Sequence, residues 1–206
     1  MRPAKAKTGA AAALAALLLW ACTVPKPVPE LGAKATIGYR RIAVVEFYNR
    51  TQHARAAEEL PALLSEKLAE WTVGTDMVLV ARSALPELGD PFVEGRIPVG
   101  VLVKIRRQHL ADAIVIGSVE EFNPYWQPSV TICLKVIDTA SAEFPFELSQ
   151  SWHAGEQQTQ EQIADYYRRN RERDDCRFGP DLFATSPGHF LRFVADRVAE
   201  QMAATL

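Results

Sequence analysis

One cysteine near the amino terminus carries the clearest chemistry in the sequence. Cys22 closes the stretch Leu19-Trp20-Ala21-Cys22, which has the pattern of a lipobox, the signal for cleavage before a cysteine that then receives lipid. An apolar run, Ala10–Trp20, precedes it and follows three basic residues, Arg2, Lys5 and Lys7. A short apolar core behind basic residues is typical of a secretory leader. The pattern predicts a leader over residues 1–21 and a lipid-modified Cys22.

The apolar leader allows two other interpretations, a membrane-spanning helix and a leader that is cleaved without lipidation. A membrane-spanning helix needs roughly 20 apolar residues, and Ala10–Trp20 is too short. Cleavage without lipidation remains open, because Trp20 is bulkier than the small residue usual at that place in a lipobox. With lipid on Cys22, the protein would be attached to the membrane without spanning it. The acyl chains would hold it there, because each buried CH₂ contributes about 0.8 kcal/mol.

Charge and length limit the classes of function. Removing residues 1–21 takes three of the 23 basic residues and none of the 25 acidic ones, which leaves a formal net charge of −5. Nucleic-acid binding, which requires a basic surface, is therefore not expected. The remaining 185 residues suit one domain of ordinary size.

The other reactive side chains give no recognisable catalytic or metal site. Once Cys22 is set aside, Cys133 and Cys176 could form a disulfide, or they could remain a small apolar strand residue and a free thiol. The four histidines fall in different predicted elements, and no nucleophile elbow, phosphate loop or dinucleotide motif occurs. Glu120 and Glu121 are adjacent, so we expect solvated charges on opposite faces of a strand. We expect neither an enzyme nor a cofactor.

The predicted elements give the architecture that positions these residues. A proline-rich stalk follows Cys22 and occupies residues 22–38, and one domain occupies 39–206. Within it, apolar periodicities predict the order β-α-β-α-β-β-β-α-α. The predicted elements are strands at Arg41–Phe47, Met77–Ala81, Ala113–Phe122, Val130–Val136 and Phe144–Ala154, with helices from near Glu58, at Val99–Leu110, Thr159–Asp174 and Pro187–Ala204. This order predicts a single α/β (α+β) domain whose mixed sheet of four to five strands is covered by helices.

Four segments in this order resemble a known group of proteins. They are RIAVVEFYNRT at Arg41–Thr51, VLVAR at Val78–Arg82, ADAIVIGSVEEF at Ala111–Phe122 and LKVIDTASAE at Leu134–Glu143. The chain is similar to envelope lipoproteins related to the curli-secretion lipoprotein, to the lipoprotein activators of penicillin-binding proteins and to the TolB amino-terminal domain. The hairpin turn departs from the group, because Ser141 and Ala142 stand where threonine and glycine are common.

The resemblance implies a non-enzymatic scaffold or regulator of the cell envelope. It would lie at the periplasmic face of the outer membrane, held by its amino-terminal lipid, and bind an envelope protein or a cell-wall component. The alternative implied by the same group is a subunit of an oligomeric outer-membrane secretion or assembly complex. The extra hairpins of the secretion-pore members have no counterpart here, and the resemblance leaves the oligomeric state open.

Two segments are candidates for contact with a partner. The loop Asn123–Pro128 carries adjacent aromatic residues, Tyr125 and Trp126, which are enriched at the energetic centres of protein interfaces. It could equally fold back over the sheet edge. The charged run Arg168–Asp175 could attract an anion, but its spacing favours a solvated helix end with i,i+4 ion pairs.

Substitution of Cys22 by alanine tests the predicted anchor. We expect Cys22→Ala to abolish incorporation of a radiolabelled fatty acid and to move the protein from the membrane fraction to the soluble fraction. Cys133→Ala is the matched control and should leave both properties unchanged. A Cys22→Ala protein that stays in the membrane fraction without acyl label would contradict the anchor.

Overall fold

The computed structural model describes residues 38–172 and 179–206. The chain divides into two units, Met1–Glu30 and Leu31–Leu206, and only the second contains described residues. The described buried hydrophobic residues, from Ile42 to Ala203, all belong to this second unit. The described core therefore belongs to the second unit.

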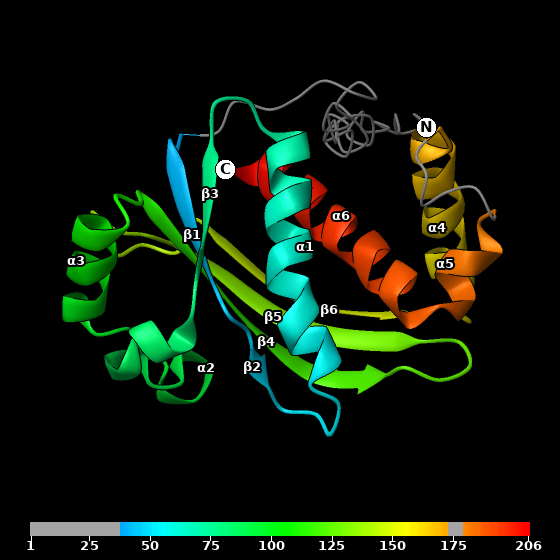
Figure 1. The fold of residues 1–206 in the computed structure, drawn as a ribbon, viewed down its shortest axis with the longest axis horizontal. Helices are drawn as coiled ribbons and strands as arrows, with labels where there is room; N and C mark the ends of the chain where they lie inside the picture. Colours follow the sequence, from blue (N-terminus) through cyan, green and yellow to red (C-terminus); the bar gives the residue numbers. More distant parts are fainter. Residues whose placement is uncertain (1–37, 173–178) are drawn as a thin grey trace, which may run out of the picture. The chain divides into compact units, whose positions relative to one another are not determined.

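The centre of the unit is a mixed sheet (Figure 1). Along the sheet the strands follow the order β3-β1-β4-β5-β6, and the short β2 also pairs with β4. β1 runs parallel to β3 and β4, whereas β4, β5 and β6 are antiparallel. The strands are β1 (Arg41–Val45), β2 (Tyr48–Asn49), β3 (Asp76–Val80), β4 (Ala113–Asn123), β5 (Ser129–Asp138) and β6 (Phe146–His153).

Helices cover the two faces of this sheet unequally. One face packs against the long helices of a large hydrophobic cluster, and the other packs against a smaller cluster beside α3, which lies apart from the other long helices in Figure 1. The helices are α1 (Arg55–Trp71), α2 (Pro91–Glu94), α3 (Val99–Gln108), α4 (Gln157–Asn170), α5 (Asp181–Thr185) and α6 (Pro187–Thr205), with short 3₁₀ turns at Arg82–Ala84 and Pro86–Leu88.

Unequal coverage explains the apolar patterns of the strands. In β1, Ile42 and Val44 face the large cluster while Ala43 and Val45 face the small one. Both faces of the strand are therefore apolar, and polar residues do not alternate with apolar ones. In β5 and β6 only one face is covered, and buried residues alternate with partly or fully exposed ones. The predicted mixed α/β domain is confirmed, and each predicted helix and strand is present within a few residues of its expected ends.

The first predicted strand is shorter than expected. It ends at Val45, and the chain resumes pairing with β4 only at Tyr48. At the interruption the side chain of Glu46 accepts a hydrogen bond from the backbone N–H of Arg82 at 2.9 Å, and Phe47 is buried in the large cluster. The break turns Phe47 toward β4.

Gly117 of β4 accommodates this phenylalanine. A Cβ atom at residue 117 would lie 2.7 Å from the ring of Phe47, which is closer than van der Waals contact allows. A glycine inside a strand often marks either a bulge or a close backbone approach. The close approach occurs at Gly117, and the bulge lies further along the strand, between Val119 and Glu121.

Two glycine-to-alanine variants test the close packing of Phe47 against Gly117. We expect Gly117→Ala to lower the free energy of unfolding by about 1–3 kcal/mol, the usual effect of overpacking, because the ring of Phe47 has no room to move. The matched control Gly100→Ala, in α3, meets nothing within 4 Å and should stabilise slightly, since alanine is the better helix former. Urea denaturation of both variants checks this; equal effects would contradict the proposed clash.

Candidate functional site

The predicted aromatic loop, residues 124–128, projects from the sheet between β4 and β5. The side chains of Tyr125 and Trp126 are 69% and 79% exposed, so the loop does not fold back to bury them. Asn123 holds its start, since its Oδ1 atom accepts a hydrogen bond from the backbone N–H of Tyr125 at 3.1 Å. The loop therefore presents two aromatic side chains to the outside on an ordered base.

His53, in the connection between β2 and α1, completes this aromatic surface. Its ring packs edge-on against Tyr125 at 5.8 Å and against the buried Phe122 at 6.2 Å between ring centroids. Sequence analysis assigned His53 no role, because no spacing rule joins it to residues 70 positions later. The structure brings them together where β4 reaches the start of α1.

Polar contacts hold the connection that carries His53. Asn49 Oδ1 accepts a hydrogen bond from the backbone N–H of Thr51 at 3.0 Å, which forms a turn of the kind that asparagine favours. Arg50 forms ion pairs with Asp90 at 2.9 Å and with Glu120 at 3.1 Å. Glu120 is thus a half-buried partner of Arg50, not the solvated charge that the sequence predicted.

The predicted cysteine residues are only partly described. Cys133 lies on β5, on the less covered face of the sheet, and its Sγ atom is 3.4 Å from the Oγ atom of Ser149 on β6. Cys22 and Cys176 lie outside the described residues, so the lipidation and the disulfide remain predictions.

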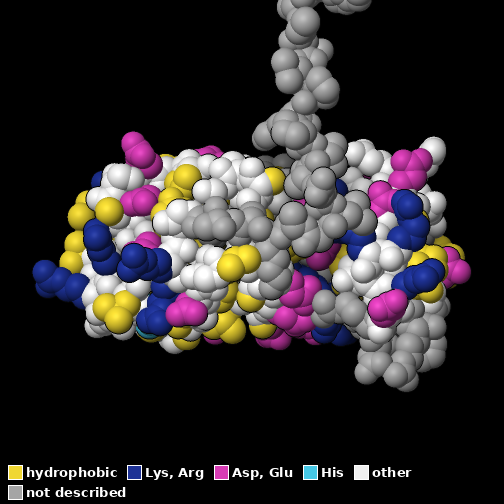
Figure 2. Space-filling model, turned by 90° about the horizontal axis from the view of Figure 1, so that it is seen from above, with side chains coloured by type: hydrophobic (Ala, Val, Ile, Leu, Met, Phe, Trp, Pro, Cys, Tyr) yellow, Lys and Arg dark blue, Asp and Glu magenta, His cyan; other side chains and the backbone are white. Residues whose placement is uncertain are grey.

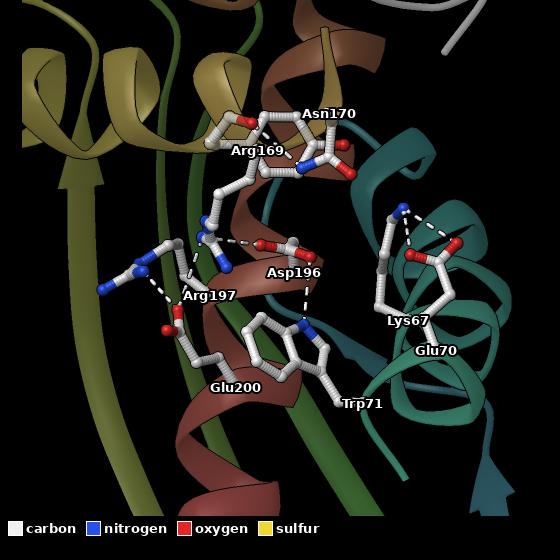
Figure 3. Close-up of polar contacts among 9 residues, drawn as sticks. Lys67, Glu70, Trp71, Arg169, Asn170, Asp196, Arg197 and Glu200 are labelled. Carbon is white, nitrogen blue, oxygen red and sulfur yellow. Dashed lines mark hydrogen bonds and ion pairs between the residues drawn. The ribbon is translucent and has the colours of Figure 1, made fainter. Parts of the chain in front are cut away.

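A buried ionic cluster joins three helices on the face of the sheet that carries the large hydrophobic cluster. In Figure 3 the side chains of Trp71 from α1 and Arg169 from α4 point toward the carboxylate of Asp196 on α6, which is 3% exposed, whereas Lys67 points toward Glu70. The indole N–H of Trp71 donates to Asp196 at 3.1 Å, and the guanidinium of Arg169 pairs with it at 3.2 Å and with Glu200 at 3.5 Å. The members shown are Lys67, Glu70, Trp71, Arg169, Asn170, Asp196, Arg197 and Glu200.

Burial controls the electrostatics of this cluster. Removal from water raises the pKa of Asp196, and this effect outweighs the attraction of Arg169, the hydrogen bond from Trp71 and the charge of Lys67. Lys67 is itself fully buried on α1, where it pairs with Glu70 at 3.0 Å. The charges satisfy one another inside the protein, which is the arrangement of a structural ion network.

The position of Arg169 differs from the expectation for the charged run Arg168–Asp175. Its guanidinium stacks over the Trp71 ring at 5.2 Å from the ring centroid, so this residue is a core contact of α4. Arg168 pairs with Asp165 one turn earlier on the same helix. Residues 173–175 of the run lie outside the described residues.

The remaining histidines and grooves do not add a reactive group. Within residues 38–172 and 179–206, no three histidine, cysteine or acidic side chains gather in a way that could hold a metal ion. An open groove of about 580 Å³ between α1 and α6 contains charges of both signs, of which Arg55 and Glu59 pair at 2.7 Å. In the same part of the chain, no helix is long and apolar enough to cross a membrane.

Comparison with solved structures gives several similar folds at low sequence identity. The PelC dodecamer from Paraburkholderia phytofirmans is 14% identical over 79% of this chain and 83% of its own, with a TM-score of 0.46. The LpoB carboxy-terminal domain from Salmonella enterica is 15% identical over 59% of this chain and 85% of its own, at 0.31. TolB from Acinetobacter baumannii is 15% identical over 66% of this chain and 29% of its own, at 0.33.

LpoB and TolB represent two of the groups that the sequence resembles. At these identities and TM-scores, the likeness concerns the fold and does not identify a function. No family model matches the chain, and no curated protein matches it.

The raised pKa of Asp196 makes a prediction with a defined sign. In the folded protein Asp196 holds its proton to a higher pH than in the unfolded chain, so its contribution to stability falls as the pH rises from about 3.8 through the raised pKa. We expect the difference in unfolding free energy, wild type minus Asp196→Asn, to decrease as the pH rises above about 3.8.

Asp138 is the matched control, with the opposite sign. Backbone hydrogen bonds from Ser141 and Ala140 lower its pKa in the folded protein. Its contribution is present above about 3.8 and is lost as the pH falls through the lowered pKa. In urea titrations, the difference in unfolding free energy, wild type minus Asp138→Asn, should therefore increase with pH over that lower range. A flat profile for Asp196→Asn would exclude a raised pKa.

Proposed function

We propose that this protein is a lipid-anchored, non-enzymatic component of the cell envelope that binds another envelope protein through its aromatic loop. The observation that carries the proposal is the pair of exposed aromatic side chains, Tyr125 and Trp126, on a loop fixed at both ends by the sheet. The leader and Cys22 support attachment to a membrane. A protein partner gains most binding free energy by burying large aromatic side chains such as these.

The surroundings of the loop support a contact surface of fixed shape. His53 packs against Tyr125 from the α1 side, and Arg50 ties the same connection to Asp90 and Glu120. Little conformational entropy would then be lost when a partner binds, because the base of the surface is already ordered. The buried charges of the ionic cluster belong to the helix packing and leave this surface as the strongest candidate for recognition.

Paired alanine substitutions test the contact. We expect Tyr125→Ala with Trp126→Ala to reduce crosslinking to an envelope partner at least tenfold, the effect of losing about 1.4 kcal/mol or more at an aromatic hot spot. A photo-crosslinking residue at the exposed Gln52, next to His53, reports the adduct in intact cells. Thermal unfolding should be unchanged, because both side chains are exposed.

The control is a pair of exposed aliphatic residues away from the loop, Val73→Ala with Val93→Ala, which are 54% and 69% exposed in the wild type. This control should retain the adduct. Undiminished crosslinking of the aromatic-loop variant would remove the loop from the proposal. Elution of the detergent-extracted protein as a high-mass ring would instead favour the alternative role in an oligomeric secretion or assembly complex.

A further inference from the structure

The outward side of α3 combines exposed aliphatic residues with arginines. Val99 and Val103 lie one helical turn apart and are 69% and 41% exposed, and Leu110, just beyond the helix, is 68% exposed. Arg106 and Arg107 follow Val103 at three- and four-residue spacing and are also exposed. The two residue types therefore share one side of the helix, named here the α3 face.

The arginines of the α3 face are electrostatically unpaired. Within the described residues, Arg106, Arg107 and the preceding Arg96 form no ion pair, whereas Lys104 pairs with Glu87 at 3.5 Å. α3 contains no acidic residue. Positive charge thus accumulates locally on a protein whose mature net charge is −5.

The acidic residues nearest to Arg106 are occupied by the backbone. Asp112 and Asp138 border a shallow groove with Arg106, but the carboxylate of Asp112 accepts from the backbone N–H of Arg40 at 3.0 Å. That of Asp138 accepts from the N–H groups of Ala140 and Ser141 at 2.7 and 2.8 Å. Neither carboxylate forms an ion pair with Arg106 or Arg107.

A second groove lies directly on the α3 face. It has a volume of about 330 Å³ between α3 and the β5–β6 turn, with Val99, Leu102 and Val103 beside Arg106 and Arg107. Guanidinium groups next to an apolar surface suit a phosphate headgroup that lies over hydrocarbon. Figure 2 shows basic and hydrophobic side chains close together at the end of the unit where α3 lies.

The described part of the chain begins beside this face. Gly38, the first described residue, borders the same groove as Arg40 and Arg106. Cys22 lies 16 residues earlier, and a fully extended chain spans at most about 3.6 Å per residue, so Cys22 lies within roughly 60 Å of Gly38. A lipid on Cys22 would keep the α3 face within reach of the bilayer.

We propose that the α3 face binds the surface of an anionic lipid bilayer. Arg96, Arg106 and Arg107 contact lipid phosphates, and Val99, Val103 and Leu110 enter the interfacial region. This deepens the proposed function, on whose lipid anchor it rests: the lipid keeps the protein at the membrane and the α3 face orients it. The orientation places the Gly38 end of the domain against the bilayer.

Vesicle binding without the acyl chain tests the proposal separately from the anchor. The chain from residue 22 onward, with Cys22→Ser, is sedimented with vesicles of equimolar phosphatidylglycerol and phosphatidylcholine, and with vesicles of phosphatidylcholine alone. We expect binding to the anionic vesicles only, with loss of binding at high salt. Arg106→Gln with Arg107→Gln should weaken binding roughly 30-fold, the effect expected for two charges at an anionic surface.

The control removes the same charge from the other side of the domain. Arg168→Gln with Arg171→Gln, on and just after α4, should bind the anionic vesicles like the wild type. Equal loss in both double variants, equal binding to neutral and anionic vesicles, or no binding by the wild type would each overturn the proposal. A change of sedimentation mass in the Arg106/Arg107 variant without vesicles would assign the face to self-association instead. Failure of acyl labelling at Cys22 would refute the anchor and leave this result unaffected.

Discussion

The carboxylate of Asp196 is the point at which the helical layer of this protein is held together. Trp71 of α1 and Arg169 of α4 contact it on α6, and the charge of Lys67 on α1 also acts on it. A buried charge is costly unless every partner is in place, so the three helices must take one relative position to satisfy it. This positions α1 over the sheet, and with α1 the connection that carries His53 beneath the aromatic loop.

The two proposed contact surfaces lie at opposite ends of one strand. β4 begins at Ala113, beside α3 and the entry of the stalk, and ends at Asn123, where the aromatic loop starts. Its 11 residues span roughly 35 Å at the rise of an extended strand. In the proposed arrangement the sheet acts as a spacer, because the end with α3 faces the lipid and the aromatic loop faces away from it, toward a partner.

Local patterns predicted the elements, because each pattern depends only on which side of a segment is buried. The continuous apolar run of β1 and the alternation in β5 and β6 are direct consequences of two-sided and one-sided burial. The contact of Phe47 with Gly117, the stacking of Arg169 on Trp71 and the meeting of His53 with Tyr125 could not be predicted in this way. Each joins residues far apart in the chain, and a charge buried by another helix looks in sequence like a solvated one.

The pairing of α1 with α6 has a consequence for the time at which the chain can fold. Trp71 and Asp196 are 125 residues apart, and α6 supplies much of the large cluster on which α1 packs. Until α6 has left the ribosome, the part of the large cluster that α6 supplies is missing, so the growing polypeptide cannot complete its core. This late closure delays folding until the last helix arrives, which would suit the predicted secretory leader, since export through a translocation channel of unfolded chains requires that folding wait.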